Sequence, residues 1–181
     1  MKKFLSYASG IIAVLLLVAA DQVTKWLALT KLYNNEPYVI IKDVLELSYL
    51  RNDGAAWGVL SGKQTFFIII TFVMLAAAIF VFIKMPITPH YRGLRVVLCT
   101  LAAGAVGNLI DRIHNGYVHD FIYFKIINFP VFNFADICVT LSMIGLVIMI
   151  LFVYKDKDWD FLKKKKAEEQ PSDASGDEDG K

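Results

Sequence analysis

The sequence predicts an all-α membrane protein with four transmembrane helices and a small β-containing loop region outside the cytoplasm. Hydrophobic residues make up 56% of the 181 residues, and the mean hydropathy is +0.51. Soluble domains are usually about 45–50% apolar. The excess lies in long blocks, and a helix needs about 20 mostly apolar residues to cross a bilayer. The net charge of +2 is small and no basic stripe with aromatics is present, so nucleic acid is not an expected partner.

The four predicted spans cover residues 4–29, 65–83, 94–113 and 131–154. The first span has an alternative interpretation as a cleavable signal peptide. Lys2 and Lys3 precede its apolar run, and Val18-Ala19-Ala20 resembles a cleavage site. The apolar pattern resumes after Ala20, so we expect residues 1–20 to be retained.

Lysine and arginine residues accumulate before the first span, between the second and third, and after the fourth, which places both termini in the cytoplasm. These residues are Lys2, Lys3, Lys84, Arg92, Arg95, Lys155, Lys157 and the four lysines at 163–166. We expect residues 1–154 to form a transmembrane catalytic domain. Residues 155–181 would form a charged, disordered cytoplasmic tail, because the segment ends in acidic, Ser- and Gly-containing sequence.

The loop between the first two spans contains a strand pattern. Residues 44–50 partly alternate, with Leu45, Leu47 and Tyr49 on one face. The turn signal Asn52-Asp53-Gly54 follows, and residues 55–60 continue as an apolar segment. A small sheet on the outer membrane surface fits this pattern, and a simple anchored loop is the alternative.

Three aspartates inside the predicted spans fall at one depth, near the outer face. Asp21, Asp111 and Asp136 lie on the first, third and fourth spans. A charged residue at the centre of a membrane helix costs about 2.5–3.5 kcal/mol, so its presence suggests function. Asn108 and Asn133 each precede an aspartate by three residues and share its helix face. We therefore expect Asp111 and Asp136 to face each other.

Two neighbouring carboxyl groups can share one proton near neutral pH. The ionised group can activate water while the protonated group polarises a peptide carbonyl, which hydrolyses the bond without a metal or covalent intermediate. Structural alternatives remain open at this stage. Asp21 can form an ion pair with Lys25, and Asp111 can pair with Lys25 or Arg112.

Other site types have weaker support. His114, His119 and Asp120 could bind a metal, but their irregular spacing favours polar loop residues. Cys99 and Cys138 lie in apolar blocks and favour buried positions. We expect no metal and no cofactor. A proton-coupled transporter with the aspartates as a relay is a further alternative, although the chain has no internal repeat.

Five blocks occur in order: Asp21-Gln22-Val23-Thr24-Lys25, Asn52-Asp53-Gly54-Ala55-Ala56-Trp57-Gly58, Gly104-Ala105-Val106-Gly107-Asn108-Leu109-Ile110-Asp111-Arg112, Val118-His119-Asp120-Phe121 and Phe132-Asn133-Phe134-Ala135-Asp136. Together they resemble the bacterial lipoprotein signal peptidases, also called signal peptidase II. The resemblance covers residues 11–154. Trp57 stands where phenylalanine is common, which is a mild departure.

The resemblance implies an intramembrane aspartyl protease of the bacterial cytoplasmic membrane. Its substrate would be a diacylglyceryl-modified prolipoprotein, cut before the lipidated cysteine, with membrane lipid around a monomeric enzyme. Asp111 and Asp136 match the catalytic pair in this interpretation. The supporting positions would be Asp21, Lys25, Asn52, Gly54, Asn108, Arg112, Asn133 and Ala135.

Overall fold

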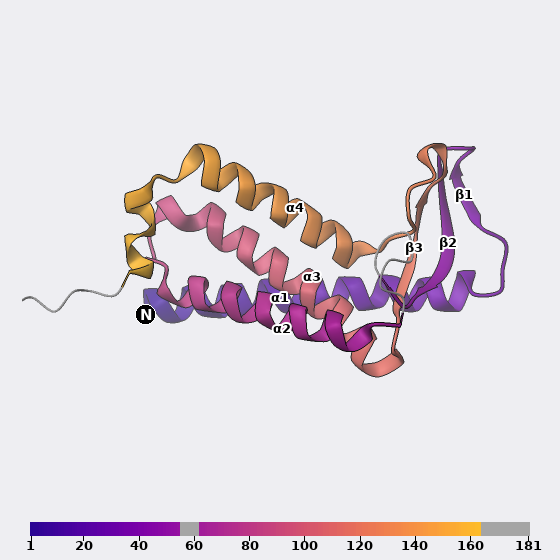
Figure 1. The fold of residues 1–181 in the computed structure, drawn as a ribbon, viewed down its shortest axis with the longest axis horizontal. Coiled ribbons are helices and arrows are strands. Elements are labelled where there is room, and N and C mark those ends of the chain that lie inside the picture. Colours follow the sequence, from indigo (N-terminus) through magenta and orange to yellow (C-terminus); the bar gives the residue numbers. More distant parts are fainter. Residues whose placement is uncertain (55–61, 164–181) are drawn as a thin grey trace, which may run out of the picture.

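The computed structural model describes residues 1–54 and 62–163. Within these ranges, four helices are long and apolar enough to cross a membrane, and they lie side by side (Figure 1). They are α1 (Lys2–Leu32), α2 (Gln64–Lys84), α3 (Arg92–Asn115) and α4 (Phe134–Ile148), the last continued by a π-helical segment, η4 (Met149–Val153). The predicted fold class is therefore confirmed.

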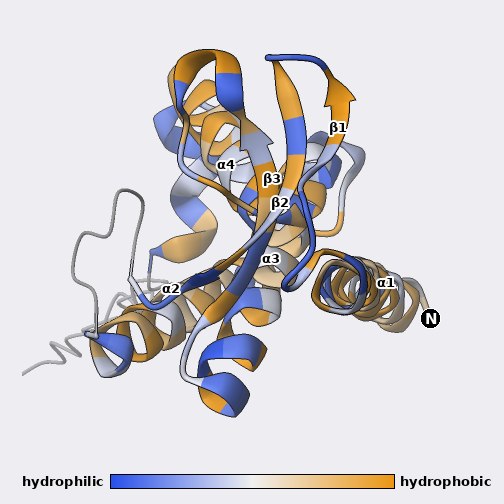
Figure 2. Ribbon diagram, turned by 90° about the vertical axis from the view of Figure 1, so that its right-hand side faces the viewer, coloured by the Kyte–Doolittle hydropathy of each residue, from blue (hydrophilic) through white to orange (hydrophobic). Residues whose placement is uncertain are grey.

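Helix α3 forms the centre of the bundle. In the most apolar 18-residue stretch of α3, 56% of the residues are buried, whereas the corresponding share in the other three spans is 6–11%. The outer helices expose many large apolar side chains. Hydrophobic residues predominate along the ribbons of α1 and α2 (Figure 2). A helix that is apolar on all sides must face either a protein core or lipid. The exposed surfaces of α1, α2 and α4 therefore suit the hydrocarbon of a bilayer.

Two glycines let the neighbouring helices approach α3 closely. A Cβ atom at Gly104 would lie 2.5 Å from the backbone oxygen of Ala135 in α4, and one at Gly107 would collide with the Asp21 carboxylate of α1. Small residues are the usual means of bringing membrane helices into contact. This close packing brings the polar residues of three helices together at one end of the bundle.

A three-stranded antiparallel sheet covers that end, while the N-terminus lies at the other (Figure 1). Its strands are β1 (Tyr38–Ile41), β2 (Leu45–Asn52) and β3 (Val118–Phe124), in the order β1-β2-β3. The predicted strand at 44–50 is confirmed as β2. Strand β3 was not expected, because its His119 and Asp120 suggested a polar loop. The predicted apolar segment at 55–60, with Trp57, lies outside the described residues.

Two other boundaries differ from the prediction. Helix α4 begins at Phe134 rather than near residue 131, because Asn133 caps it: the Asn133 side chain accepts from the Asp136 backbone N–H at 3.0 Å. The segment after residue 154 was expected to be disordered, but Asp156–Leu162 forms a 3-10 helix, η5. Its Trp159 and Phe161 pack against an apolar cluster at the end of the bundle opposite the sheet, which provides the contacts that hold it.

Candidate active site

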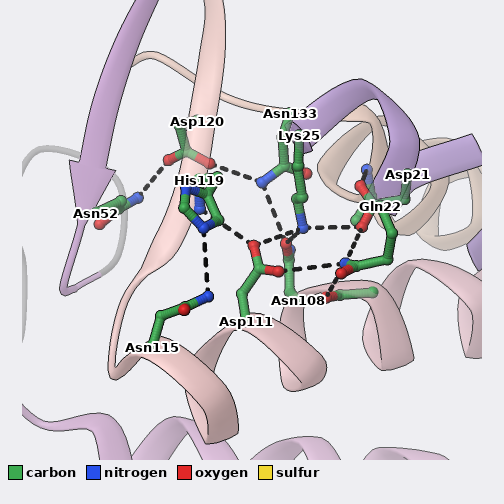
Figure 3. Close-up of polar contacts among 12 residues, drawn as sticks. Asp21, Gln22, Lys25, Asn52, Asn108, Asp111, Asn115, His119, Asp120 and Asn133 are labelled. Atoms are coloured by element: carbon green, nitrogen blue, oxygen red, sulfur yellow. Dashed lines mark hydrogen bonds and ion pairs between the residues drawn. The ribbon is translucent and has the colours of Figure 1, made fainter. Parts of the chain in front are cut away.

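A network of buried polar side chains lies where α1, α3 and α4 meet strands β2 and β3 (Figure 3). Buried polar groups are costly unless each finds a hydrogen-bond partner, so a large network of this kind in a membrane protein indicates a functional site. Its buried members are Asp21, Lys25, Asn108, Asp111, His119, Asp120 and Asn133.

Asp111 lies in the part of the network that is organised around Lys25. The Lys25 ammonium forms ion pairs with Asp21 at 2.8 Å and with Asp111 at 3.0 Å. Asp111 also accepts from Nε2 of Gln22 at 3.2 Å and from the His119 backbone N–H at 3.1 Å. Both structural alternatives, Asp21 with Lys25 and Asp111 with Lys25, are thus confirmed as contacts. Asp111 is held as an ion-pair partner.

Asp136 lies in the first turn of α4 and is fixed by two donors. Its Oδ1 accepts from Nδ2 of Asn108 at 2.7 Å, and its Oδ2 accepts from the Asn133 backbone N–H at 3.0 Å. The second bond completes a capping box, in which the side chains at the cap and at the third helical position satisfy each other's backbone groups. A carboxylate at a helix N-terminus is also favoured by the helix dipole.

Asp120 of β3 is the carboxyl group that shares its surroundings with Asp136. Its side chain is enclosed, with 1% of the residue exposed. Its Oδ1 accepts from Nδ2 of Asn133 at 2.6 Å, and its Oδ2 accepts from Nδ2 of Asn52 at 2.7 Å. Asn133 therefore contacts both Asp120, through its amide, and Asp136, through its backbone.

Asp120 and Asp136 line the same cavity, which has a volume of about 480 Å³. Its other lining residues come from β2 and the following turn, α2, α3, α4 and the loop before α4: Asn52, Gly54, Phe67, Arg112, Phe129, Pro130, Val131, Phe132, Ile137, Thr140 and Leu141. Asp111 lines a separate cavity of about 330 Å³ together with Lys25 and His119. The expected pairing of Asp111 with Asp136 across one cavity is therefore not what the structure shows, because Lys25 draws Asp111 to the other side.

The electrostatics of Asp120 differ from those of an ordinary aspartate. Burial, and next the negative charge of Asp136, raise the pKa of Asp120 to about 7. The amides of Asn52 and Asn133 oppose this shift only in part. Two neighbouring carboxyl groups that cannot both ionise easily are the arrangement that lets one proton be shared.

Arg112 supplies positive charge to the same cavity. Its guanidinium stacks over the ring of Phe67, with the central carbon 4.9 Å from the ring centroid. Its Nε atom is buried and has no hydrogen-bond partner among the described residues. The Nε–H is therefore an unpaired donor in a residue that lines the cavity together with two aspartates.

The remaining predicted site residues have supporting positions. The side chain of Asn52 accepts from the Gly54 backbone N–H at 3.0 Å, which shapes the turn after β2 beside Asp120. The Ala135 backbone N–H donates to Asp21 at 2.9 Å, so Asp21 ties α1 to the start of α4. The amide of Asn108 connects Lys25 to Asp136: its oxygen accepts from Lys25 and its nitrogen donates to Asp136.

Sequence reasoning missed Asp120 and Gln22 as members of the site. The available signal for Asp120 was its place in the Val-His-Asp-Phe block, one of the five blocks that carry the family resemblance. The structure does not favour the alternative in which His119 and Asp120 bind one metal ion, because the two residues are neighbours in strand β3. Successive strand residues point to opposite faces, and His119 contacts Tyr49 and Asn115 while Asp120 contacts Asn52.

Comparisons with known proteins agree with this architecture. The family described as "Signal peptidase (SPase) II" matches residues 13–152. Proteins named "Lipoprotein signal peptidase" from Staphylococcus aureus strains JH9 and Newman are 41% identical over 157 residues, covering 86% of this chain and 93% of theirs.

Two solved structures, both described as bacterial membrane enzymes studied by the in meso method, have the same fold. One has a TM-score of 0.71 at 37% identity and covers 88% of this chain and 94% of its own. The other has a TM-score of 0.69 at 38% identity and covers 81% and 95%. The transporter alternative has no support from these relatives. With a family match over most of its length and relatives at 41% identity, this chain belongs to the signal peptidase II family of membrane peptidases.

Proposed function

We propose that this enzyme removes the signal peptide from diacylglyceryl-modified prolipoproteins, cutting before the lipidated cysteine with Asp120 and Asp136 as its catalytic pair. The observation that carries this assignment is the shared cavity: these two aspartates line it together, while Asp111 lies in another cavity with Lys25. Family membership supports prolipoprotein signal peptides as the substrate class.

The two carboxyl groups would take different roles. Asp120, whose pKa is raised to about 7, carries the shared proton at neutral pH and donates it in a hydrogen bond to the scissile carbonyl. Asp136, which accepts from Asn108 and the Asn133 backbone, stays ionised and takes a proton from the attacking water. The tetrahedral intermediate then collapses as a proton passes to the leaving amine. This is general acid–base catalysis by two side chains.

The shape of the cavity supports a substrate that arrives from the membrane. Apolar side chains line most of it, and Leu141, which is 62% exposed on the outside of α4, forms part of the wall. A signal peptide could therefore reach the two aspartates laterally from lipid. Arg112 offers N–H donors to backbone carbonyls of an extended peptide.

We further propose that the site faces the extracytoplasmic side and that both termini are cytoplasmic. The basic residues Lys84, Arg92 and Lys155 belong to the end of the bundle opposite the sheet, in agreement with the expected cytoplasmic excess of positive charge. The enzyme is proposed to act as a monomer surrounded by membrane lipid, with residues 1–154 as its catalytic domain.

Cleavage of a lipidated precursor by purified variants tests the catalytic pair. Asp120→Asn and Asp136→Asn should each lower kcat about a hundred- to ten-thousandfold, because Asn cannot transfer the proton. Asp111→Asn should keep measurable turnover and lose mainly thermal stability. The double Asp120→Asn/Asp136→Asn variant should be no worse than either single variant, since the pair acts as a unit. An inactive but stably folded Asp111→Asn enzyme alongside an active Asp120→Asn enzyme would reinstate the pairing expected from sequence.

A further inference from the structure

Lys25 is surrounded by three oxygen acceptors, one for each N–H of its ammonium group. They are Asp21 Oδ2 at 2.8 Å, Asn108 Oδ1 at 2.9 Å and Asp111 Oδ2 at 3.0 Å. The Lys25 side chain is 2% exposed, so these three oxygens are its main partners. Two carboxylates already more than neutralise one ammonium. The contact with the uncharged amide of Asn108 therefore needs another explanation.

The contact determines which way the Asn108 amide faces. An ammonium group can only donate, so the oxygen end of the amide must face Lys25. The nitrogen end then faces the opposite way and donates to Asp136 Oδ1 at 2.7 Å. Nδ2 of Asn133 also donates to Asn108 Oδ1, at 3.1 Å, and favours the same orientation. A reversed amide would place its N–H groups against Lys25 and its oxygen against the Asp136 carboxylate, which is unfavourable on both sides.

We propose that Lys25 is a positioning residue for peptide-bond hydrolysis, which orients the Asn108 amide so that this amide holds the Asp136 carboxylate ready to accept a proton from water. The assignment rests on the proposed function of Asp136. Lys25 does not line the cavity that Asp136 lines, and the hydrogen bonds that connect it to Asp136 run through Asn108.

The effect should be visible in the pH dependence of the reaction. Several charged groups near Asp136 also influence its ionisation. They belong to the elements that pack against the first turn of α4: Asp21 and Lys25 of α1, Asp111 and Arg112 of α3, and Asp120 of β3. If the Asn108 donor is lost, the ionised form of Asp136 loses a hydrogen bond that favours it. The acidic limb of the kcat profile should then move to higher pH.

A test must separate orientation from charge balance, because Lys25→Met alone would leave two buried carboxylates unpaired. We therefore compare Lys25→Met with Lys25→Gln, both in the Asp111→Asn background. Both substitutions remove the ammonium charge, so the two variants have the same local net charge and differ in whether residue 25 keeps an N–H donor for Asn108. Relative to Lys25→Gln, Lys25→Met should lower kcat about tenfold, leave KM nearly unchanged and move the acidic limb to higher pH.

The decisive measurement is whether the effect of Lys25 passes through Asn108. In an Asn108→Ala/Asp111→Asn background, which lacks the amide, Lys25→Met and Lys25→Gln should give the same kcat and the same acidic limb. Such non-additivity is the signature of two residues that act in one path. Lys25→Gln in the Asp111→Asn background keeps an N–H donor, and should recover part of the lost rate where Lys25→Met does not.

Three results would overturn the proposal: equal kcat losses from Lys25→Met with and without Asn108, an unshifted acidic limb, or failure of both Lys25 variants to fold while Asp111→Asn folds. The last result would make Lys25 a purely structural residue. Asp120→Asn and Asp136→Asn are measured in parallel, and an active enzyme from either would reject the catalytic pair itself rather than the role of Lys25.

Discussion

At the scale of single residues, the four aspartates of the network differ only in what surrounds them. Asp21 and Asp111 share the Lys25 ammonium, whereas Asp120 receives two neutral amides and lies in one cavity with a second carboxyl group. An ammonium partner favours the ionised form of a carboxyl group, and a neighbouring carboxylate disfavours it. The environment therefore divides one residue type between ion pairing and proton transfer.

The raised pKa of Asp120 predicts how activity depends on pH. If Asp120 must be protonated to polarise the scissile carbonyl, the active fraction is high below its pKa of about 7 and falls as pH rises through that value. We expect kcat to decline about tenfold per pH unit well above 7. The profile is measured with a lipidated precursor in detergent at constant ionic strength. A rate that stays level to pH 9 would contradict the assigned role.

The same shift makes a prediction about stability. The native state holds the Asp120 proton up to about pH 7, and the ordinary pKa is 3.8. The native state therefore binds more protons between these values, and its stability falls as pH rises from about 4 to about 7. An asparagine cannot ionise, so the Tm of Asp120→Asn minus that of wild type should increase over this window and level off above it.

Thermal unfolding in detergent from pH 4 to 8.5 measures this difference. The exposed Asp156, changed to Asn, serves as the control, and its Tm difference from wild type should stay constant over the same range. A Tm difference for Asp120→Asn that does not change with pH would show that the buried carboxyl group has an ordinary pKa in the folded protein.

At the scale of elements, the approach of α4 to α3 decides where Asp136 lies. Gly104 is in contact with the first turn of α4, and an added Cβ would lie 2.5 Å from the Ala135 carbonyl oxygen and 2.9 Å from a Val139 methyl group. Neither the helix backbone nor a β-branched side chain can move aside cheaply. The position of Asp136 relative to Asp120 therefore depends on Gly104 of α3, because glycine has no side chain to hold α4 away.

We predict that Gly104→Ala lowers both Tm and kcat, the latter by about a hundredfold, because displacing a catalytic group by about 1 Å is enough for such a loss. Gly93→Ala in the same helix is the matched control. Its Cβ would meet only the flexible end of Met149, and alanine is the better helix former. The control should keep its activity and its Tm. Comparable losses in the two variants would mean that α3 tolerates no substitution of glycine for reasons unrelated to α4.

At the scale of the whole molecule, the sheet and the basic end of the bundle lie at opposite ends of the four helices (Figure 1). This separation predicts the topology. Reporter fusions after Tyr33 and Ile127 should report the outer side, and fusions after Pro86 and Lys166 the cytoplasmic side. Purified protein should also retain residues 1–20. A mature protein that begins at Asp21, or an inverted reporter pattern, would reject the topology.

The depth of the site predicts a dependence on the lipid of the substrate. Asp136 lies in the first turn of α4 and Asp120 in β3, at the end of the bundle that the sheet covers, where a lipid-anchored cysteine would be held at the membrane surface. Each buried methylene of an acyl chain contributes about 0.8 kcal/mol to membrane binding. We expect kcat/KM for a precursor with its diacylglyceryl group to exceed that of the unmodified peptide more than about a hundredfold. Equal values in bilayers would indicate a general intramembrane protease.

The sequence by itself determined the class of the protein and most of the members of its site. Long apolar blocks specify membrane helices, since hydrocarbon admits few other structures. Strand β2, the ion pair of Asp21 with Lys25 and the positions of Asn108 and Asn133 also followed from spacing along the chain, whereas Asn52 entered the site only through the family resemblance. Such features depend on local periodicity, which the order of residues shows directly.

Only the tertiary structure decided which aspartates form a pair. Spacing along α3 and α4 placed Asp111 and Asp136 at one depth, but depth does not show which side chain a neighbouring helix supplies. Lys25 of α1 engages Asp111, and strand β3 brings Asp120 beside Asp136 instead. The proton affinity of a carboxyl group depends on burial and on the nearest charges. Those charges belong to segments far apart in the sequence, so their contacts exist only in the folded protein.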